Sequence, residues 1–327
     1  MQVGLIGLGN LGTAVGDLIA RNGHDVLGWE HNDAAVAQIN EHHTNERYLP
    51  GVPLSPRLRA TSDAAAVFRY ASAIFIAIPS AFIDSTLRPL VGVADPQTLF
   101  VNMTKGIDRE TGMTSYQVVS HLLPDNRHVM LSGPSVANEF ARGMPTTVVV
   151  AGPDISDLLL VSRLLDNDTF RTRFSDDWIG VELGGILKNI YAIGLGMFDG
   201  MNIRSVNFRA VYLTIALEEI YRFGVVMGAK IETFLYLSGI GDLLATALSE
   251  HSHNRRLGEL LAQGVHLPEI REKMGVLPEG YNTLQAALYL AEKQHVALPL
   301  AKGLWDVIED RYTAEHFIRL FIKDFVE

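Results

Sequence analysis

Continuous apolar runs alternate with stretches of helical spacing through the first half of the chain. The runs predict six buried strands, at residues 3–6, 25–29, 73–78, 99–102, 128–131 and 146–151. Helical spacing between them predicts helices at residues 11–21, 34–41, 62–70 and 113–122. Strands without polar alternation are typical of a parallel sheet that helices cover on both faces, so the pattern predicts a doubly wound α/β fold.

The pattern changes near residue 177, where the strand-like runs end. Helical spacing continues over residues 178–198, 207–227, 231–235, 257–263, 284–293 and 300–311. We therefore expect an α/β domain over residues 1–177 and an all-α domain over residues 178–327. A polar, proline-containing stretch at residues 44–56 is expected to form an ordered loop.

Composition supports two globular domains and narrows the possible chemistry. The chain has 327 residues, against about 100–200 for a single domain. Its 27 Lys and Arg and 37 Asp and Glu give a net charge of −10, which argues against nucleic acid or an anionic membrane as a partner. The absence of cysteine excludes disulfides, thiol nucleophiles and thiolate metal sites.

No segment is predicted to target or span a membrane. The apolar run at residues 70–83 is interrupted by Pro79 and is too short to span a bilayer. The N-terminus lacks the basic flank and the small-residue cleavage site of a signal peptide. We therefore expect a cytoplasmic enzyme.

A glycine-rich turn, GLGNLG at residues 7–12, follows the first predicted strand and opens the first predicted helix. Gly7 would form the tight turn, Gly9 would let the backbone approach a pyrophosphate, and Gly12 would let the helix pack closely on the strand. The helix N-terminus offers N–H groups and a partial positive charge to phosphate. This context predicts a Rossmann-type dinucleotide site in the domain over residues 1–177.

The choice of dinucleotide depends on the end of the second strand. Glu30 can accept hydrogen bonds from the adenine ribose there and would repel a 2′-phosphate, so it favours NAD. His31 follows immediately and could instead lie near that phosphate, which leaves NADP open. The expected cofactor contacts in this domain are Gly7, Gly9, Asn10, Leu11, Gly12, Glu30 and His31.

Polar motifs follow two later strands and recur in the helical half. Lys105 in TKG, and Gly133 and Ser135 in LSGPS, come after strand ends, where ligands bind in open α/β sheets. The helical half opens with ELGGILKN, in which two glycines precede Lys188 by one turn. We expect these glycines to let the helix approach the cofactor closely. Two further motifs follow, GIGD at residues 239–242 and SHNRR at residues 252–256.

In this order, the motifs GxGxxG, RYLPG, TKG, LSGPS, ELGGxLKN, GxGD and NRRxG resemble those of NAD(P)-dependent glycerol-3-phosphate dehydrogenase, most closely the bacterial type. The resemblance covers essentially the whole chain. It implies reversible reduction of dihydroxyacetone phosphate to sn-glycerol 3-phosphate, a compound of glycerophospholipid metabolism, by hydride transfer with NAD or NADP. It also implies a homodimer.

The resemblance assigns roles to individual residues. Lys188 matches the proton acceptor or donor, and Lys105 matches a lysine beside the substrate and the nicotinamide. Thr246 matches a threonine that assists Asp242. The implied substrate contacts are Lys105, Gly133, Ser135, Lys188, Asp242, Ser252, His253, Asn254 and Arg255, and the further implied cofactor contacts are Lys105, Ala137, Leu277 and Glu279.

The chemistry of the reaction independently supports a lysine base. Oxidation of a secondary alcohol requires removal of its hydroxyl proton as the hydride leaves, and a neutral lysine can accept that proton. Free lysine has a pKa of about 10.4, and a neighbouring cation such as Lys105 acts to lower it. Ser252 is expected to cap a helix whose first turn, with Asn254 and Arg255, binds phosphate. No grouping of side chains suggests a metal site.

Several positions depart from the family pattern. His253 stands where the family usually carries an arginine that touches phosphate and cofactor. Leu11 replaces an aromatic residue, Ile215 stands where an arginine is common, and residues 201–206 replace a glycine-rich stretch. These differences leave open a divergent member that acts on another phosphorylated ketone or alcohol.

Two other classes of protein stay open. The β-hydroxyacid dehydrogenases share a Rossmann domain, a helical domain and a catalytic lysine, but four residues after that lysine they normally have Asn, where this chain has Ala192. A non-catalytic NAD-binding regulator is expected to lack Lys188 or Asp242, and both are present.

Overall fold

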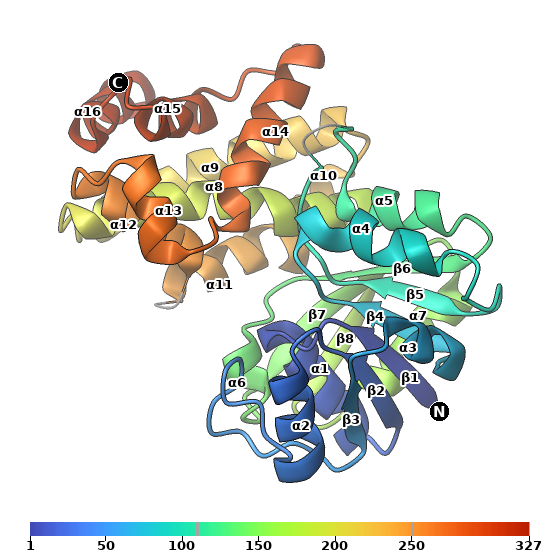
Figure 1. Cartoon of the computed structure of the whole chain (residues 1–327). Coiled ribbons are helices and arrows are strands. Elements are labelled where there is room, and N and C mark those ends of the chain that lie inside the picture. Colours follow the sequence, from blue (N-terminus) through green and yellow to red (C-terminus); the bar gives the residue numbers. More distant parts are fainter. Residues whose placement is uncertain (109–110, 250–251, 327) are drawn as a thin grey trace. The chain divides into compact units, whose positions relative to one another are not determined.

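The computed structural model describes residues 1–108, 111–249 and 252–326. Its eight-stranded sheet has the order β3-β2-β1-β4-β5-β6-β7-β8 (Figure 1). The strands are β1 Gln2–Ile6, β2 Asp25–Trp29, β3 Leu58–Thr61, β4 Ala73–Ile76, β5 Leu99–Asn102, β6 Arg127–Ser132, β7 Thr146–Ala151 and β8 Phe170–Ser175. Neighbouring strands are parallel except β6 and β7, which are antiparallel. The sheet is therefore mostly parallel, as predicted, and differs from the prediction in this one antiparallel pair.

Helices cover both faces of this sheet, as the continuous apolar strands predict. Val3 and Leu5 of β1 belong to one core cluster, together with buried residues of α1 and α7. Ile6 and Ile76 belong to a second cluster, together with buried residues of α3, α4 and α5. The elements are α1 Asn10–Arg21, α2 Asp33–His42, α3 Ala64–Tyr70, η1 Ser80–Phe82, α4 Ile83–Leu87, η2 Arg88–Leu90, α5 Ser115–Leu122, α6 Ala137–Phe140 and α7 Ile155–Leu165. The predicted doubly wound α/β fold is confirmed.

The second half of the chain is helical over its described residues. Its elements are α8 Trp178–Gly200, α9 Val206–Val226, α10 Ile231–Phe234, η3 Leu237–Gly241, α11 Asp242–Leu248, α12 His253–Ala262, α13 Leu267–Met274, α14 Glu279–Lys293, α15 Pro299–Ile308 and α16 Ala314–Val326. One buried carboxylate joins three of these helices. Glu219 of α9 accepts hydrogen bonds from the Tyr191 hydroxyl of α8 and from two backbone N–H groups of α15, at Leu300 and Ala301.

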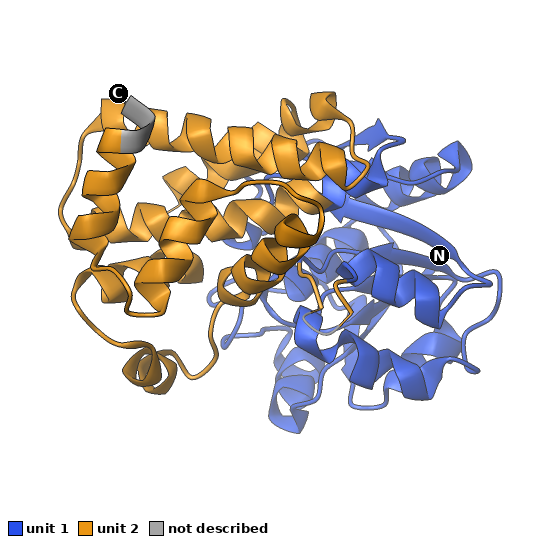
Figure 2. Cartoon of the chain, turned by 90° about the horizontal axis from the view of Figure 1, so that it is seen from above, with its two compact units in different colours: residues 1–105, 113–182 blue, residues 106–112, 183–327 orange. Residues whose placement is uncertain are grey.

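The chain divides into two compact units (Figure 2). Unit 1 comprises Met1–Lys105 and Met113–Glu182, and unit 2 comprises Gly106–Gly112 and Leu183–Glu327. The division falls within α8, slightly beyond the change of pattern at residue 177. The segment Gly106–Gly112 belongs to unit 2 because Ile107 packs with Ile186 and Ala286 there.

Glu182, the last residue of unit 1, is completely buried near the beginning of α8. Its Oε1 atom accepts a hydrogen bond from the backbone N–H of Tyr116 at 2.7 Å. Burial raises the pKa of this carboxyl to about 8, although hydrogen bonds from Thr114 and Tyr116 act to lower it. The Tyr116 ring stacks on Trp178 with centroids 4.4 Å apart, so α5 and the start of α8 form one packed contact within unit 1.

Within the described residues, two stretches are long and apolar enough to cross a membrane by length and composition. The first is Trp178–Gly200, in which the 18-residue apolar window is 89% buried, as in the core helix of a soluble protein. The second, Ile231–Leu248, is 33% buried, and the structure divides it among α10, η3 and α11. Both are weak evidence for a membrane span.

Candidate active site

The glycine-rich turn of unit 1 has the conformation that the sequence predicts. Gly7 has φ +101°, and a Cβ atom there would lie 2.7 Å from the carbonyl oxygen of Ala77. A Cβ atom on Gly12 would lie 1.9 Å from the carbonyl oxygen of Gly7, so α1 packs directly on the turn. A Cβ atom on Gly9 would meet nothing within 4 Å, which leaves room for the close approach of a ligand. Among the described residues no side chain caps α1, so its first N–H groups suit a phosphate.

The loop at residues 44–56 is anchored to this turn, and the anchor, Asn45, was not foreseen from the sequence. The Asn45 side chain is fully buried, and its Nδ2 atom donates to the Leu8 carbonyl oxygen and to the Thr13 hydroxyl, each at 2.9 Å. The side-chain amide of Asn10 donates to the carbonyl oxygen of Tyr48 in the same loop. The RYLPG motif therefore lies beside the glycine-rich turn because polar side chains of the turn and the loop bind backbone groups of each other.

The carboxyl of Glu30 follows β2, as predicted, and is 3% exposed. Its Oε1 atom lies 2.9 Å from Nδ1 of His31 and accepts a hydrogen bond from the backbone N–H of Asn32 at 3.1 Å. His31 is therefore a partner of Glu30, while its own side chain is 69% exposed. These contacts fix the carboxylate at the end of the second strand.

The remaining unit 1 positions also follow strand ends. Lys105 lies after β5, next to Thr104, whose hydroxyl donates to the Ile78 carbonyl oxygen at 2.8 Å. Gly133 comes directly after β6 with φ +114°, a conformation that favours glycine. The Ser135 hydroxyl donates to the carbonyl oxygen of Gly133 at 3.1 Å, and Ala137 begins α6.

In unit 2, the structure brings three predicted catalytic residues together. Nζ of Lys188, on α8, donates to Oδ1 of Asp242 and to Oγ1 of Thr246, each at 2.6 Å. Asp242 and Thr246 are one turn apart on α11, so both reach the same ammonium. The side chains of Lys188 and Asp242 are 12% and 2% exposed. An adjacent carboxylate favours the protonated amine, which opposes the effect expected of Lys105.

Next to Lys188, a chain of amides links three helices. Asn189 of α8 accepts a hydrogen bond from the Asn254 side chain at 3.1 Å, and Asn254 in turn accepts one from the backbone N–H of Gly280 at 2.9 Å. Gly280 follows Glu279 at the start of α14, and Leu277 precedes that helix. The Ser252 hydroxyl caps α12 by accepting from the N–H of Arg255, as predicted. Asn189 and Gly280 were not assigned roles from the sequence, although Asn189 adjoins the lysine in the ELGGILKN motif.

Gly184, the first of the two glycines before Lys188, serves a different contact from the one expected. A Cβ atom on Gly184 would lie 2.2 Å from the carbonyl oxygen of Ser238. Gly184 therefore lets α8 pack against the backbone of η3, the element that leads into Asp242. At Gly184 the expected space for the cofactor is filled by the Ser238 backbone, so the expectation is wrong for this glycine, and for Gly185 it stays a prediction.

Two residues of the predicted phosphate region differ in their surroundings. His253, the first residue of α12, is exposed. The Arg255 side chain is 15% exposed, and its guanidinium donates to the carboxylate of Asp199 and to the carbonyl oxygens of Ala247 and Ser249. The Arg255 guanidinium is therefore already bound by a carboxylate of α8 and by backbone carbonyls at the end of α11.

Comparison with known proteins identifies the family. A family model described as the N-terminus of NAD-dependent glycerol-3-phosphate dehydrogenase matches residues 2–157, and the model of its C-terminus matches residues 177–319. The chain belongs to the NAD-dependent glycerol-3-phosphate dehydrogenase family. The resemblance stated from the sequence motifs is confirmed, and with it the assignment of this chain to the oxidoreductases.

Individual members of the family are similar over nearly their whole length. A glycerol-3-phosphate dehydrogenase [NAD(P)+] of Lysinibacillus sphaericus is 40% identical over 310 residues, which cover 94% of this chain and 91% of that protein. The corresponding protein of Carboxydothermus hydrogenoformans is 38% identical over 310 residues, 94% of this chain and 92% of that protein. The crystal structure of glycerol-3-phosphate dehydrogenase from Coxiella burnetii has a TM-score of 0.92 at 30% identity and covers 98% of both chains.

Proposed function

We propose that this chain interconverts dihydroxyacetone phosphate and sn-glycerol 3-phosphate with NAD or NADP, and that Lys188 donates or accepts the proton. The observation that carries the proposal is the contact of the Lys188 ammonium with Asp242 and Thr246 in a family member. When bound, the nicotinamide supplies or accepts the hydride. Residues of unit 2 contribute contacts to the substrate, and Lys188 of this unit moves the proton.

Asp242 and Thr246 hold Nζ of Lys188 in one place and favour its protonated form. That form donates a proton to the substrate oxygen as the carbonyl is reduced, and its charge stabilises the developing alkoxide. In the oxidative direction the neutral amine accepts the hydroxyl proton, and Asp242 then stabilises the ammonium that forms. The same ion pair therefore suits both directions of the reaction.

The phosphate of the substrate is proposed to bind at the N-terminus of α12. Ser252 caps this ten-residue helix, and Asn254 is held by Asn189 and Gly280 beside Lys188. A helix N-terminus stabilises negative charge through its N–H groups and its dipole. Lys105, Gly133 and Ser135 of unit 1 are proposed as further substrate contacts, following the family motifs.

The direct test follows NADH absorbance in the presence of dihydroxyacetone phosphate. We expect consumption of NADH that depends on this substrate, and formation of NADH when sn-glycerol 3-phosphate and NAD are supplied. Turnover of a different phosphorylated ketone, without turnover of dihydroxyacetone phosphate, would reject the proposed substrate. It would still support an NAD(P)-dependent reduction of a phosphorylated ketone. Cofactor binding without turnover of any phosphorylated ketone would favour a regulatory protein.

The glycine-rich turn fits a dinucleotide, and Glu30 is proposed to select NAD. Glu30 directly follows β2, and its carboxylate contacts His31. At this position the carboxylate would repel a 2′-phosphate. We expect kcat/KM to be about tenfold higher with NADH than with NADPH, a difference of about 1.4 kcal/mol, because the carboxylate repels the 2′-phosphate of NADPH. Glu30→Ala should reduce this ratio, while Glu41→Ala on the exposed end of α2 should leave it unchanged. A preference of the wild-type enzyme for NADPH would contradict the assignment.

His253 is proposed to weaken phosphate binding relative to an arginine. It is exposed at the first position of α12, close to the Ser252 cap, and an imidazole lacks the planar set of N–H donors with which a guanidinium binds phosphate. We expect His253→Arg to lower the KM for dihydroxyacetone phosphate about threefold to tenfold at pH 7.5, with kcat changed less. The same substitution at exposed His266 provides the control. An unchanged or higher KM in His253→Arg would show that this position lies outside the phosphate site.

We also propose that the enzyme acts as a cytoplasmic homodimer, on the basis of its resemblance to the family. Sedimentation velocity of the purified protein tests the oligomeric state directly. A single species at the monomer mass across the micromolar range would reject the dimer.

A further inference from the structure

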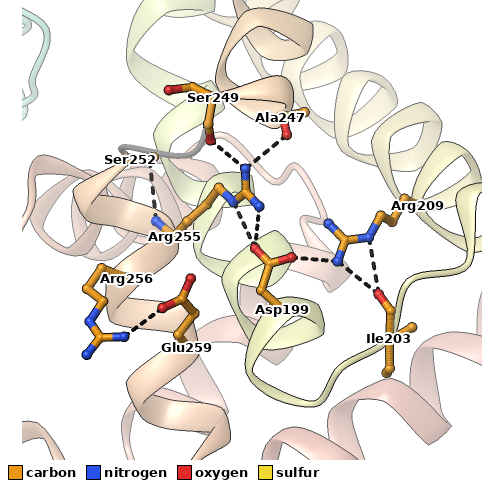
Figure 3. A network of polar contacts seen from close by, with 9 residues as sticks. All are labelled: Asp199, Ile203, Arg209, Ala247, Ser249, Ser252, Arg255, Arg256 and Glu259. Atoms are coloured by element: carbon orange, nitrogen blue, oxygen red, sulfur yellow. Dashed lines mark hydrogen bonds and ion pairs between the residues drawn. The ribbon is translucent and has the colours of Figure 1, made fainter.

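Asp199 lies near the C-terminal end of α8, the helix that also carries Lys188. The two residues are eleven positions apart, which is close to three full turns and places them on the same face of the helix. Asp199 belongs to none of the motifs that indicate the family. Its carboxylate nevertheless makes the contacts shown in Figure 3 with two arginines from two other helices.

The two carboxylate oxygens of Asp199 have separate partners. Oδ1 accepts from Nη2 of Arg209, on α9, at 2.6 Å. Oδ2 accepts from Nε and Nη2 of Arg255, on α12, at 2.8 and 2.5 Å. Charge-assisted contacts of this kind fix the orientation of a guanidinium more firmly than a single neutral hydrogen bond does.

Arg255 also binds the end of α11, the helix that contains Asp242 and Thr246, the catalytic partners of Lys188. Its Nη1 atom donates to the carbonyl oxygens of Ala247 and Ser249, at 3.1 and 2.5 Å (Figure 3). These carbonyls lie at the C-terminal end of α11, where a cation is favourable. Asp242 and Thr246 belong to the same helix, so one guanidinium connects α8, α11 and α12.

The backbones of α8 and α12 are also in direct contact at this point. A Cβ atom on Gly196 would lie 1.9 Å from the carbonyl oxygen of Arg255, and one on Gly258 would lie 1.8 Å from that of Ile193. The start of α12 therefore rests on the α8 backbone, and the ion pair of Asp199 with Arg255 lies beside that contact. Close backbone packing fixes the distance between the helices, and the ion pair restrains the side chain that reaches α11.

We infer that Asp199 is a positioning residue that acts through Arg255 to hold the N-terminus of α12 and the end of α11 in register with Lys188. On this inference, which rests on the proposed function, Arg255 serves the site by fixing Ser252, Asn254 and Thr246 rather than by contacting phosphate. Both residues thereby act on the binding of the phosphorylated substrate, and the variants leave the glycine-rich turn and Glu30 of unit 1 unchanged.

Asp199→Asn distinguishes positioning from direct contact because the two predict opposite signs. The substitution removes a negative charge, so electrostatics alone would leave unchanged or lower the KM for an anionic substrate. If Arg255 contacted phosphate directly, release from Asp199 would act in the same direction. If Asp199 positions the site, we expect the KM for dihydroxyacetone phosphate to rise about tenfold, with the KM for NADH within about twofold of wild type.

Arg255→Lys is expected to have a similar effect, because lysine keeps the charge but lacks the planar set of donors that spans Asp199 and the two carbonyls. The double variant should then raise KM no more than either single variant, since both changes remove one coupling. Arg256→Gln is the control, because this neighbouring arginine is 55% exposed and pairs with Glu259 on its own helix. We expect its KM to stay within about twofold of wild type.

An unchanged or lowered KM in Asp199→Asn would overturn the inference, as would a lower melting temperature with unaltered kinetic constants. A rise in KM of equal size in Arg256→Gln would also overturn it, since the effect would then be general to this surface. If Asp199→Asn gives no soluble protein, Asp199→Glu decides the question, because it keeps the charge and displaces the carboxylate. A raised KM there supports positioning, and an unchanged KM rejects it. Failure of the wild-type enzyme to reduce dihydroxyacetone phosphate would instead reject the proposed function.

Discussion

Replacing Lys188 by methionine is expected to lower kcat for reduction of dihydroxyacetone phosphate by about 10³-fold, within the roughly 10²-fold to 10⁴-fold that a general acid contributes. The KM for NADH should change little, because the predicted cofactor contacts of unit 1 are intact. Methionine approximates the length and volume of the lysine side chain but offers no proton. The loss should therefore reflect proton transfer and charge stabilisation rather than a cavity.

A second measurement separates chemistry from damage to the fold. Lys188→Ala should regain part of its activity when small primary amines are added, with a rate that depends on the pKa of the amine. The control is Lys293→Met, which removes an exposed lysine that lies over the Tyr289 ring on α14. Full activity in Lys188→Met, or an equal loss in Lys293→Met, would contradict the assigned role.

The second large effect concerns stability, and it arises from the buried carboxyl of Glu182. Burial raises its pKa from 4.5 to about 8, so the folded protein binds this proton more tightly than the unfolded chain does. Between these values the folded state retains a proton that the unfolded state has released, and the free energy of unfolding falls as pH rises. The loss from this one group amounts to at most about 5 kcal/mol and is complete above about pH 8.

Glu182→Gln should remove this pH dependence, because glutamine is neutral throughout and keeps an acceptor for the Tyr116 N–H. We expect wild type and variant to have similar urea midpoints near pH 5, and the variant to be the more stable by about 2–5 kcal/mol near pH 9. Glu41→Gln, at an exposed carboxylate of α2, should shift the midpoint equally at every pH. Parallel stability curves for wild type and Glu182→Gln would show that the Glu182 carboxyl does not titrate in this range.

The strands could be predicted from the sequence where they are covered on both faces, and the two missed strands share one physical cause. All six predicted strands are present, and the two that were missed, β3 and β8, are the two edges of the sheet. β8 has the sequence FRTRFS with several exposed positions, and β3 alternates between buried and less buried residues. A search for continuous apolar runs overlooks such strands, because an edge strand keeps polar side chains.

Prediction of the site residues from the sequence was also incomplete. Lys188 and Asp242 are separated by 54 positions, and motif order indicated both before the structure brought them together. Asp199 and Asn45 were missed because each acts by binding other parts of the protein. Single aspartates and asparagines are common in a sequence, and only the contacts of Asp199 with two arginines, or of Asn45 with Leu8 and Thr13, distinguish them.

The assignment of Gly106–Gly112 to unit 2 has a consequence for the order of events during synthesis. This segment leaves the ribosome long before Ile186 and Ala286, the residues against which Ile107 packs. The strands of unit 1 are all synthesised before Ile186 and Ala286, so its sheet can form while Ile107 still lacks these partners. Unit 2 can be completed only after α14 has been synthesised. A nascent chain that ends at Glu182 would therefore contain Ile107 without its cluster partners Ile186 and Ala286.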